Sequence, residues 1–311
     1  MSAERTTVLF VDDEERILRS LRMLFRAHYD VLMTTSGREA LEIVRSRTVH
    51  VVVSDQRMPE MLGVDLLRRV REASPATMRL LLTGYSDLQA IVASVNEGEI
   101  FRFIEKPWQP PYLLGVVEQA AKVALQEFAV GAARPAEVTD LAAMKFKLLV
   151  IDEDAATVQM VREIAGSYQS IHHAETIEAA LSVLSDNEIA VVIAELTHRH
   201  DDVAGALKTL KQYNPSTLTI ATSAQRDSRS LIELINQGQI FRFLPKPLSR
   251  ELLKRGLNAA CAHYARLKNA PVLLQRHAVE QAKFEPMSLS ARLLDYWRKI
   301  RENGRNSRQV A

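Results

Sequence analysis

Acidic residues, a hydroxyl and a lysine stand at the ends of separate apolar runs in the first half of the sequence. Asp12 and Asp13 follow LFV, Asp55 follows VVVS, Thr83 follows LLL, and Lys106 follows FRFIE. Clustered carboxylates favour a hard divalent cation such as Mg²⁺, which commonly binds carboxylate and phosphoryl oxygens together. With the charge shielded in this way, a carboxylate oxygen can attack phosphorus and form an acyl phosphate. Lys106 would then balance the charge of the transferred group, and the Thr83 hydroxyl would bond one of its oxygens.

The elements that must position these residues are short strands that alternate with helices. The predicted strands are Val8–Val11, Val51–Ser54, Leu80–Thr83 and Phe101–Ile104, and the predicted helices are Arg16–Phe25, Arg38–Arg47, Val64–Ala73, Leu88–Asn96 and Pro111–Phe128. Strands that are apolar throughout are buried on both faces, which indicates a parallel sheet covered by helices. We therefore expect an α/β, doubly wound (βα)₅ fold of the flavodoxin-like kind. In such sheets, ligands bind beyond the carboxyl ends of the strands, where the polar residues above converge.

The second half of the sequence repeats the first at a constant offset of 140 residues. LFVDDEE, VVVSDQRMP and IFRFIEKPW in the first half correspond to LVIDEDA, VVIAELTHR and IFRFLPKPL in the second. A constant offset without gaps indicates duplication. At the position of Asp55, the second copy has Glu195.

The repeat predicts the domain organisation. The first domain spans residues 1–128, and a second domain of the same kind spans residues 145–268. Residues 129–144 between them turn small and proline-containing, which is typical of a linker. Residues 269–311 have no counterpart in the first copy and form a tail that we expect to be helical.

The composition excludes several classes of protein. The chain has 311 residues, a formal net charge of +2 and a single cysteine, Cys261. The small net charge gives no general signal for nucleic-acid or membrane binding, and one cysteine excludes an intramolecular disulfide framework. No apolar stretch approaches the ~20 residues that span a membrane, and the N-terminus does not resemble a signal peptide. We therefore expect a cytoplasmic protein.

The first copy, from Val8 to about Leu125, resembles the receiver domain of response regulators in two-component signalling. The resemblance implies that Asp55 accepts a phosphoryl group from a histidine kinase or a phosphotransfer protein, with Mg²⁺ as the cofactor. It also implies roles for six other residues: Asp12 and Asp13 as metal ligands, Arg57 as a metal ligand through its backbone carbonyl, Thr83 as the switch hydroxyl, Phe103 as the switch aromatic, and Lys106 as the lysine of the site. Lys106-Pro107 matches the family's cis peptide.

The second copy resembles a degenerate receiver domain. It keeps most of the site, as Asp152, Glu153, Ser223, Phe243 and Lys246, but has Glu195 at the acceptor position. One extra methylene displaces a carboxylate oxygen by about 1.5 Å, and an error of that size can cost on the order of 100-fold in rate. Three interpretations remain open: an inert structural or dimerising copy, a copy locked in an active-like state by Glu195 and Lys246, or a copy that still binds metal or accepts phosphate poorly.

Four histidines lie where a metal site would be conceivable. His172 and His173 are adjacent in a predicted strand, so their side chains point to opposite faces of the sheet. His198 and His200 lie in a polar loop, where we expect them to face solvent.

The tail carries an apolar stripe that indicates an amphipathic helix. Leu289, Leu293, Trp297 and Ile300 share one face of this predicted helix. The stripe could pack back onto the receiver domains, or bind a partner or a second subunit. DNA binding by this helix is a third interpretation, although one basic helix without a helix-turn-helix pair recognises base pairs in a DNA groove poorly.

These features together predict a phosphorylation-dependent signalling protein and not an enzyme. We expect its output to be protein–protein contact or homodimerisation through the receiver surfaces or the tail. Two alternatives are a relative or regulatory subunit of a receiver-controlled cyclic-di-GMP phosphodiesterase or phosphatase, and a transcription regulator. Residues 269–311 are too few to build a catalytic domain, and no DNA-binding module is recognisable.

Overall fold

The computed structural model describes residues 5–84, 100–130, 145–166, 170–196, 203–224, 235–236 and 240–269. The chain divides into two compact units. The first contains the described residues up to Val130, and the second contains nearly all of those from Lys145 onward. The predicted helix Leu88–Asn96, residues 131–144 of the predicted linker and residues 270–311 of the tail lie outside the described residues.

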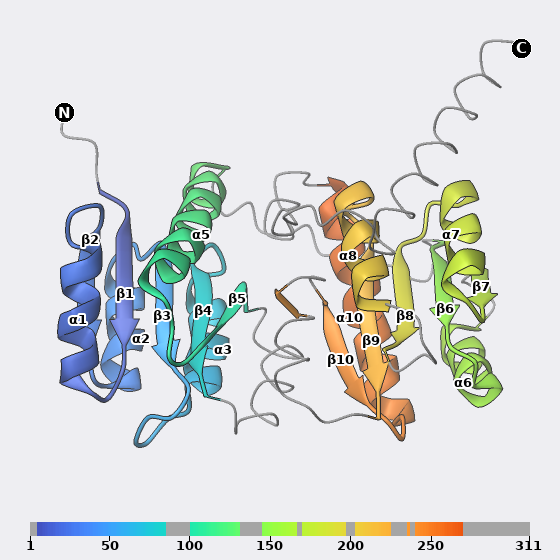
Figure 1. The fold of residues 1–311 in the computed structure, drawn as a ribbon, viewed down its shortest axis with the longest axis horizontal. Coiled ribbons are helices and arrows are strands. Elements are labelled where there is room, and N and C mark those ends of the chain that lie inside the picture. Colours follow the sequence, from blue (N-terminus) through green and yellow to red (C-terminus); the bar gives the residue numbers. More distant parts are fainter. Residues whose placement is uncertain are drawn as a thin grey trace, which may run out of the picture. The chain divides into compact units, whose positions relative to one another are not determined.

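The first unit contains one parallel sheet with the strand order β2-β1-β3-β4-β5 (Figure 1). Its strands are β1 (Thr7–Val11), β2 (Asp30–Thr34), β3 (Val51–Asp55), β4 (Met78–Thr83) and β5 (Arg102–Glu105). Its described helices are α1 (Glu15–Phe25), α2 (Gly37–Ser46), α3 (Gly63–Ala73) and α5 (Pro110–Val130). The predicted flavodoxin-like α/β fold is therefore confirmed for this unit. The predicted elements that fall on described residues agree with the structure within two residues at each end.

Helices cover both faces of the first sheet, which is why β1, β3 and β4 are buried along their whole lengths. Residues of α1 at helical spacing, Leu18, Leu21 and Phe25, pack with α5 and with one side-chain row of the strands, including Phe10 and Val53. The helices α2 and α3 pack together and contact β1 and β3. In Figure 1, α1 and α5 lie in front of this sheet, and α2 and α3 lie behind it.

The second unit repeats this arrangement. Its sheet has the strand order β7-β6-β8-β9-β10, and all neighbouring strands are parallel. The strands are β6 (Lys147–Ile151), β7 (Ser170–Ala174), β8 (Val191–Glu195), β9 (Leu218–Ser223) and β10 (Arg242–Pro245), and the helices are α6 (Ala155–Ala165), α7 (Ile177–Asp186), α8 (Val203–Tyr213) and α10 (Arg250–Asn269). The helices α6 and α10 share one core with the sheet, and α7 and α8 share another.

The similarity between the two units includes the way in which helices begin. The Ser36 hydroxyl accepts a hydrogen bond from the N–H of Glu39 at the start of α2. At the equivalent position in the second unit, Thr176 Oγ1 accepts one from the N–H of Ala179 at 3.2 Å and caps α7. Both caps satisfy a backbone donor that has no partner within the helix.

Two features of composition can be followed in the fold. Among the described helices, none combines the length and the apolar character needed to cross a membrane. Cys261 lies buried in the core on α10, and burial raises the pKa of its thiol to about 11. The thiol is therefore protonated near neutral pH, which makes it a poor nucleophile.

Candidate functional site

Three chain segments that are distant in sequence meet at the carboxyl edge of the first sheet. Asp12 directly follows β1, Asp55 is the last residue of β3, and Lys106 directly follows β5. Since β1 and β3 are neighbours in a parallel sheet, their ends lie side by side. The backbone N–H of Lys106 donates to the carbonyl oxygen of Thr83 at 2.9 Å, which holds the lysine beside the end of β4.

The Lys106 ammonium contacts both buried carboxylates. Its Nζ lies 2.6 Å from Asp55 Oδ1 and 3.0 Å from Asp12 Oδ2. The remaining oxygens accept backbone hydrogen bonds: Asp55 Oδ2 from the N–H of Arg57 at 2.8 Å, and Asp12 Oδ1 from the N–H of Glu14 at 2.9 Å. Each of the four carboxylate oxygens therefore has a donor, and this allows two acidic groups to sit together at a largely dry edge.

The pKa values in this group reflect competition between burial and pairing. Burial raises the pKa of Asp12 and the nearby charge of Asp55 adds to this, whereas the Glu14 N–H and Lys106 oppose it. Burial alone would lower the pKa of Lys106. Its hydrogen bonds and ion pairs with Asp55 and Asp12 outweigh burial, so the pKa of Lys106 is raised and the ammonium stays charged.

Thr83 and Phe103 occupy the positions that the sequence predicts, at and near the ends of β4 and β5. Thr83 is fully buried, and its hydroxyl donates to the carbonyl oxygen of Gly84 at 3.2 Å. Phe103 pairs in register with Leu81 and is 1% exposed. An inward rotation of Phe103 on phosphorylation would need an outward starting position, and in this structure the ring is already inside.

The residues present fit a Mg²⁺ ion held by two carboxylates. Asp12 and Asp55 are close enough to share one ammonium, whereas Asp13 is exposed. Over the described residues, no group of three or more His, Cys, Asp or Glu side chains is placed to hold a metal ion. Mg²⁺ is usually bound by one or two carboxylates together with waters and substrate phosphates, so two carboxylates are an ordinary donor set. The assignments of Asp13 and of the Arg57 carbonyl as ligands remain predictions.

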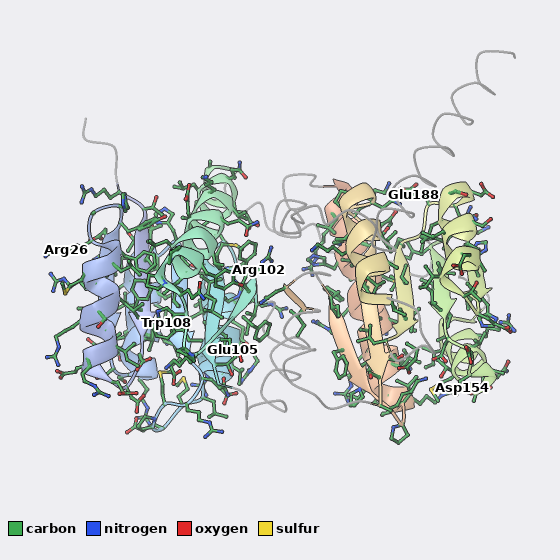
Figure 2. The ribbon with its side chains drawn as sticks, viewed as in Figure 1. Arg26, Arg102, Glu105, Trp108, Asp154 and Glu188 are labelled. Atoms are coloured by element: carbon green, nitrogen blue, oxygen red, sulfur yellow. The ribbon has the colours of Figure 1, made fainter. Side chains whose placement is uncertain are left out.

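Three further residues shape this site. A Cβ at Gly63 would lie 2.1 Å from the carbonyl oxygen of Asp55, so only glycine allows α3 to approach β3 this closely. The buried Gln56 holds the same junction, because its side-chain oxygen accepts from the N–H of Val64 at 3.2 Å. Trp108, labelled in Figure 2, has its ring centroid 5.8 Å from Lys106 Nζ. Sequence spacing alone gives no signal for such close approaches.

The second unit repeats the charge arrangement with a glutamate in place of the aspartate. Lys246 Nζ lies 2.9 Å from Asp152 Oδ2 and 2.6 Å from Glu195 Oε2. Asp152 Oδ1 accepts from the N–H of Asp154 at 2.9 Å, and the Lys246 N–H donates to the Ser223 carbonyl at 2.8 Å. Burial would lower the pKa of Lys246, but its bonds to Glu195 and Asp152 raise it. Both lysines precede a cis proline, Pro107 and Pro247.

The surroundings of Glu195 differ from those of Asp55 in one respect. The offset of 140 residues places Val203 at the position of Gly63, and Val203 is buried at the start of α8. Since no side chain fits at Gly63, α8 must meet β8 differently from the way in which α3 meets β3. Ser223 and Phe243 are buried like their counterparts, and Glu153 is exposed like Asp13.

Of the four histidines, two fall on described residues. His173 hydrogen-bonds the carbonyl oxygen of Asp152 through Nε2 at 2.8 Å. His172 pairs in register with Leu149 on β6, and its Nε2 is buried without a hydrogen-bond partner among the described residues. His198 and His200 lie outside the described residues.

Comparison with known proteins defines the class of the first unit. Residues 8–118 match the family model of the response regulator receiver domain. These residues are therefore a receiver domain of the two-component signalling type, with a parallel five-stranded sheet and the paired aspartates and lysine at its carboxyl edge.

The individual relatives are regulators of transcription by name. The chain is 41% identical over 122 residues to the hydrogenase transcriptional regulatory protein HoxA of Cupriavidus necator, covering 39% of this chain and 25% of the relative. It is 39% identical over 117 residues to HoxA of Bradyrhizobium diazoefficiens, covering 38% and 24%. A solved receiver domain of an HD domain-containing protein from Pseudomonas fluorescens is 36% identical, with 42% of this chain and 96% of that chain covered and a TM-score of 0.40. The chain thus spans about a quarter of the length of the curated relatives it matches.

Proposed function

We propose that this chain is a phosphorylation-dependent switch in which a histidine kinase or a phosphotransfer protein phosphorylates Asp55. The observation that carries the proposal is the Lys106 ammonium between Asp55 and Asp12 at the carboxyl edge of a receiver domain. In the proposed role the chain accepts a phosphoryl group and passes on a change of shape. It is not an enzyme beyond promoting its own phosphorylation and slow dephosphorylation.

The chemistry assigns a task to each residue of the site. A carboxylate oxygen of Asp55 attacks the phosphorus of a phosphohistidine, the new P–O bond forms as the P–N bond breaks, and the imidazole leaves with the electron pair. Lys106 neutralises the charge of the arriving group. The Thr83 hydroxyl gives up its hydrogen bond to the Gly84 carbonyl oxygen and donates to a phosphoryl oxygen instead. Asp12, Asp13, Asp55 and the Arg57 carbonyl would hold Mg²⁺, which would supply the remaining neutralisation of charge.

We propose that the second unit is a degenerate receiver that is held in one state by Glu195. Its sheet order and its buried lysine bridge match those of the first unit, which supports the kinship. Glu195 already gives Lys246 a carboxylate contact, and Val203 replaces the glycine that lets a helix approach the acceptor strand. In this proposal the second unit keeps one conformation, whereas the first unit can be switched.

The output in this proposal is protein–protein contact or homodimerisation. Added charge of about −1.5 to −2 on Asp55 changes which groups Lys106 and Thr83 contact, and so changes the surface around β4 and β5. We propose that this output surface spans about residues 87–103, most of which lie outside the described residues, as does the tail from residue 270.

A second candidate function is the regulation of transcription. It is favoured by the names of the relatives, which include hydrogenase transcriptional regulatory proteins and the DNA-binding transcriptional regulator NtrC. The similarity covers only about a quarter of those proteins. The two candidates are distinguished by titrating the full chain, with and without beryllofluoride, against a pool of genomic DNA duplexes at moderate salt. Saturable, sequence-selective binding would establish the second candidate.

The first candidate is tested by phosphorylation of the full chain. We expect incubation with Mg²⁺ and acetyl phosphate to add one phosphoryl group, measured as intact mass, and Asp55→Asn to abolish it. Asp65→Asn, a surface aspartate on α3, is the matched control and should be labelled like the wild type. Labelling of Asp55→Asn at another residue would overturn the assignment.

A further inference from the structure

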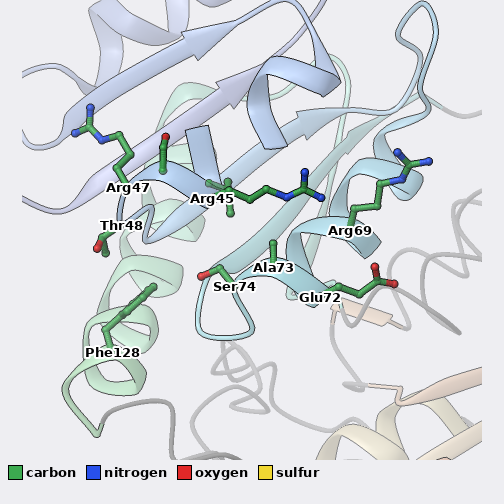
Figure 3. A pocket seen from close by; sticks show the side chains of 10 residues that line it. Arg45, Arg47, Thr48, Arg69, Glu72, Ala73, Ser74 and Phe128 are labelled. Atoms are coloured by element: carbon green, nitrogen blue, oxygen red, sulfur yellow. The ribbon is translucent and has the colours of Figure 1, made fainter. Parts of the chain in front are cut away.

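A second cleft lies in the first unit, away from the paired aspartates. It has a volume of about 570 Å³ and lies between the C-terminal parts of α2, α3 and α5 (Figure 3). Helices of a βα unit run antiparallel to its strands, so these helix ends lie near the amino edge of the sheet, opposite to Asp55. The volume falls within the ~300–1,000 Å³ typical of small-molecule sites. Six of the residues that line it are Arg45, Arg47, Thr48, Arg69, Ser74 and Phe128.

The cleft contains positive charge that the protein does not neutralise. Arg47 pairs with Asp30 at 2.8 Å, and Glu72 at the rim is engaged by Arg68 at 3.4 Å. Within the described part of the chain, Arg45 and Arg69 have neither an ion pair nor a hydrogen bond. Figure 3 shows the Arg45 side chain extending toward the side of the cleft where Arg69 lies. Two guanidinium groups are thus left for an external anion.

Helix electrostatics explain only part of this arrangement. A cation in the last turn of a helix is favourable, which accounts for Arg45 in the last turn of α2. The basic residue in the last turn of α3 is Arg71, and Arg69 stands before that turn. Guanidinium groups match the geometry of phosphate oxygens through paired hydrogen bonds, so phosphate is an anion that arginines lining one cleft would fit.

An aromatic ring gives the cleft an apolar wall opposite these charges. Phe128 is half-buried near the end of α5 and packs on the first core. Its ring is held in an edge-on contact with His50, with 5.2 Å between the ring centroids. Figure 3 shows the ring on the other side of the cleft from Arg69. A fixed ring beside cationic groups suits a ligand with a planar base and a phosphate.

We propose that this cleft binds a nucleotide, with Arg45 and Arg69 contacting its phosphate and the Phe128 ring contacting its base. The site goes beyond the proposed function, because it uses neither Asp55 nor its phosphorylation. Its place at the other end of the sheet makes it an independent input to the receiver domain.

The test is calorimetric titration of the full chain with AMP, GMP and inorganic phosphate. EDTA is present throughout, so that divalent-dependent binding at the aspartates does not contribute. We expect saturable nucleotide binding that Arg45→Ala with Arg69→Ala weakens by about tenfold or more. The control removes the same charge at the C-terminal end of α1, as Arg22→Ala with the C-cap variant Arg26→Ala, and should leave the affinity unchanged; Arg26 is labelled in Figure 2. Thermal unfolding of each variant checks that it folds.

The Phe128→Leu variant separates a nucleotide site from a general anion site. It should weaken AMP or GMP binding and leave inorganic phosphate binding unaltered, because only the base contacts the ring. Two results would overturn the proposal: no saturable binding of either nucleotide at millimolar concentration, or equal loss of affinity in the cleft variant and the α1 control. Nucleotide binding that is insensitive to Phe128→Leu would also overturn it.

Discussion

Lys246 Nζ lies 2.6 Å from Glu195 Oε2, the same distance that separates Lys106 Nζ from Asp55 Oδ1. The longer glutamate side chain therefore keeps the lysine contact of the shorter aspartate. Since this ion pair is unchanged, the difference between the two units lies in the length of the acidic side chain and in the residue at the start of the next helix, Gly63 or Val203. The second unit keeps the charges of a receiver site and alters its geometry.

Shortening Glu195 should restore acceptor chemistry to the second unit. In an Asp55→Asn background, Glu195→Asp is expected to gain a phosphoryl group from acetyl phosphate. The rate should exceed that of Asp55→Asn alone by about 100-fold, because the oxygen moves back by one bond length. Intact mass and peptide mapping locate the label. An unlabelled double variant would mean that the packing of Val203, and not side-chain length, is what prevents phosphorylation.

Because α3 approaches β3 closely, we expect Gly→Ala substitutions at two positions to change the free energy of unfolding by different amounts. Gly63→Ala should lower the free energy of unfolding by about 1–3 kcal/mol, because its Cβ would lie 2.1 Å from the Asp55 carbonyl oxygen. Phosphorylation should slow as well, since the acceptor residue must shift. Gly115→Ala on α5 is the control, because a Cβ there meets no atom within 4 Å, and the change should be neutral or stabilising. Urea unfolding compares the two; equal effects would contradict the steric argument.

Removing the bridging ammonium should make stability depend on pH. Lys106→Met leaves Asp12 and Asp55 without their cation, and we expect a loss of about 1–3 kcal/mol at pH 7. Burial already raises the pKa of Asp12, and the variant removes a group that lowers it. The folded variant then holds a proton that the unfolded chain releases, so its stability falls as pH rises above the ordinary aspartate pKa of about 4.

The measurement for Lys106→Met is urea unfolding at pH 5 and pH 7, relative to the wild type at each pH. The loss in free energy of unfolding, relative to the wild type, should be smaller at pH 5. Added Mg²⁺ should also recover more stability in the variant than in the wild type, because it replaces the missing positive charge. If the loss in free energy of unfolding were the same at both pH values, it would come from lost packing of the lysine side chain and not from lost charge.

A buried lysine in the second unit predicts a pH effect of the opposite sign. Lys211 is 2% exposed, its Nζ donates to the Thr217 carbonyl at 2.5 Å, and burial lowers its pKa to about 7. Below that pH the lysine is protonated in both the folded and unfolded chain. Above it, and up to the ordinary value of 10.5, only the unfolded chain binds the proton. Stability should therefore rise with pH in this window, by at most about 1.4 kcal/mol per unit.

The variant Lys211→Met should remove this rise and be more stable than the wild type at pH 7. Lys254→Met, at an exposed position on α10, is the control and should keep the wild-type dependence. Unfolding of the full chain at pH 7 and pH 9 provides the comparison. Identical pH profiles for the two variants would show that Lys211 gains access to water in the folded protein.

The strand ends were predictable from the sequence because a strand that is buried on both faces has apolar residues at successive positions. Val51–Ser54 and Leu80–Thr83 stand out for this reason, and the polar residues that follow them must then lie at one edge. The same logic placed Asp12, Asp55 and Lys106 without any knowledge of distances. Local patterns carry this information because the residue types of each strand reflect whether its two faces are buried.

The burial of two arginines and the need for one glycine left no such pattern. Arg79 and Arg102 are almost completely buried, which their charge alone would argue against. Each donates to a nearby backbone carbonyl, of Thr77 at 2.5 Å and of Phe101 at 2.7 Å, and Arg102 also lies over the Phe101 ring. The need for glycine at position 63 likewise depends on a carbonyl in another element, which no local pattern encodes.

The presence of one aspartate and one glutamate at equivalent strand ends, Asp55 and Glu195, bears on how a signal would be encoded. Under the proposed function, each molecule exists in two modification states and not four. No order of events and no cooperation between two acceptors can then arise within one chain. A graded kinase signal would be reported as a proportional fraction of modified molecules, and any threshold in the response would have to come from association between chains.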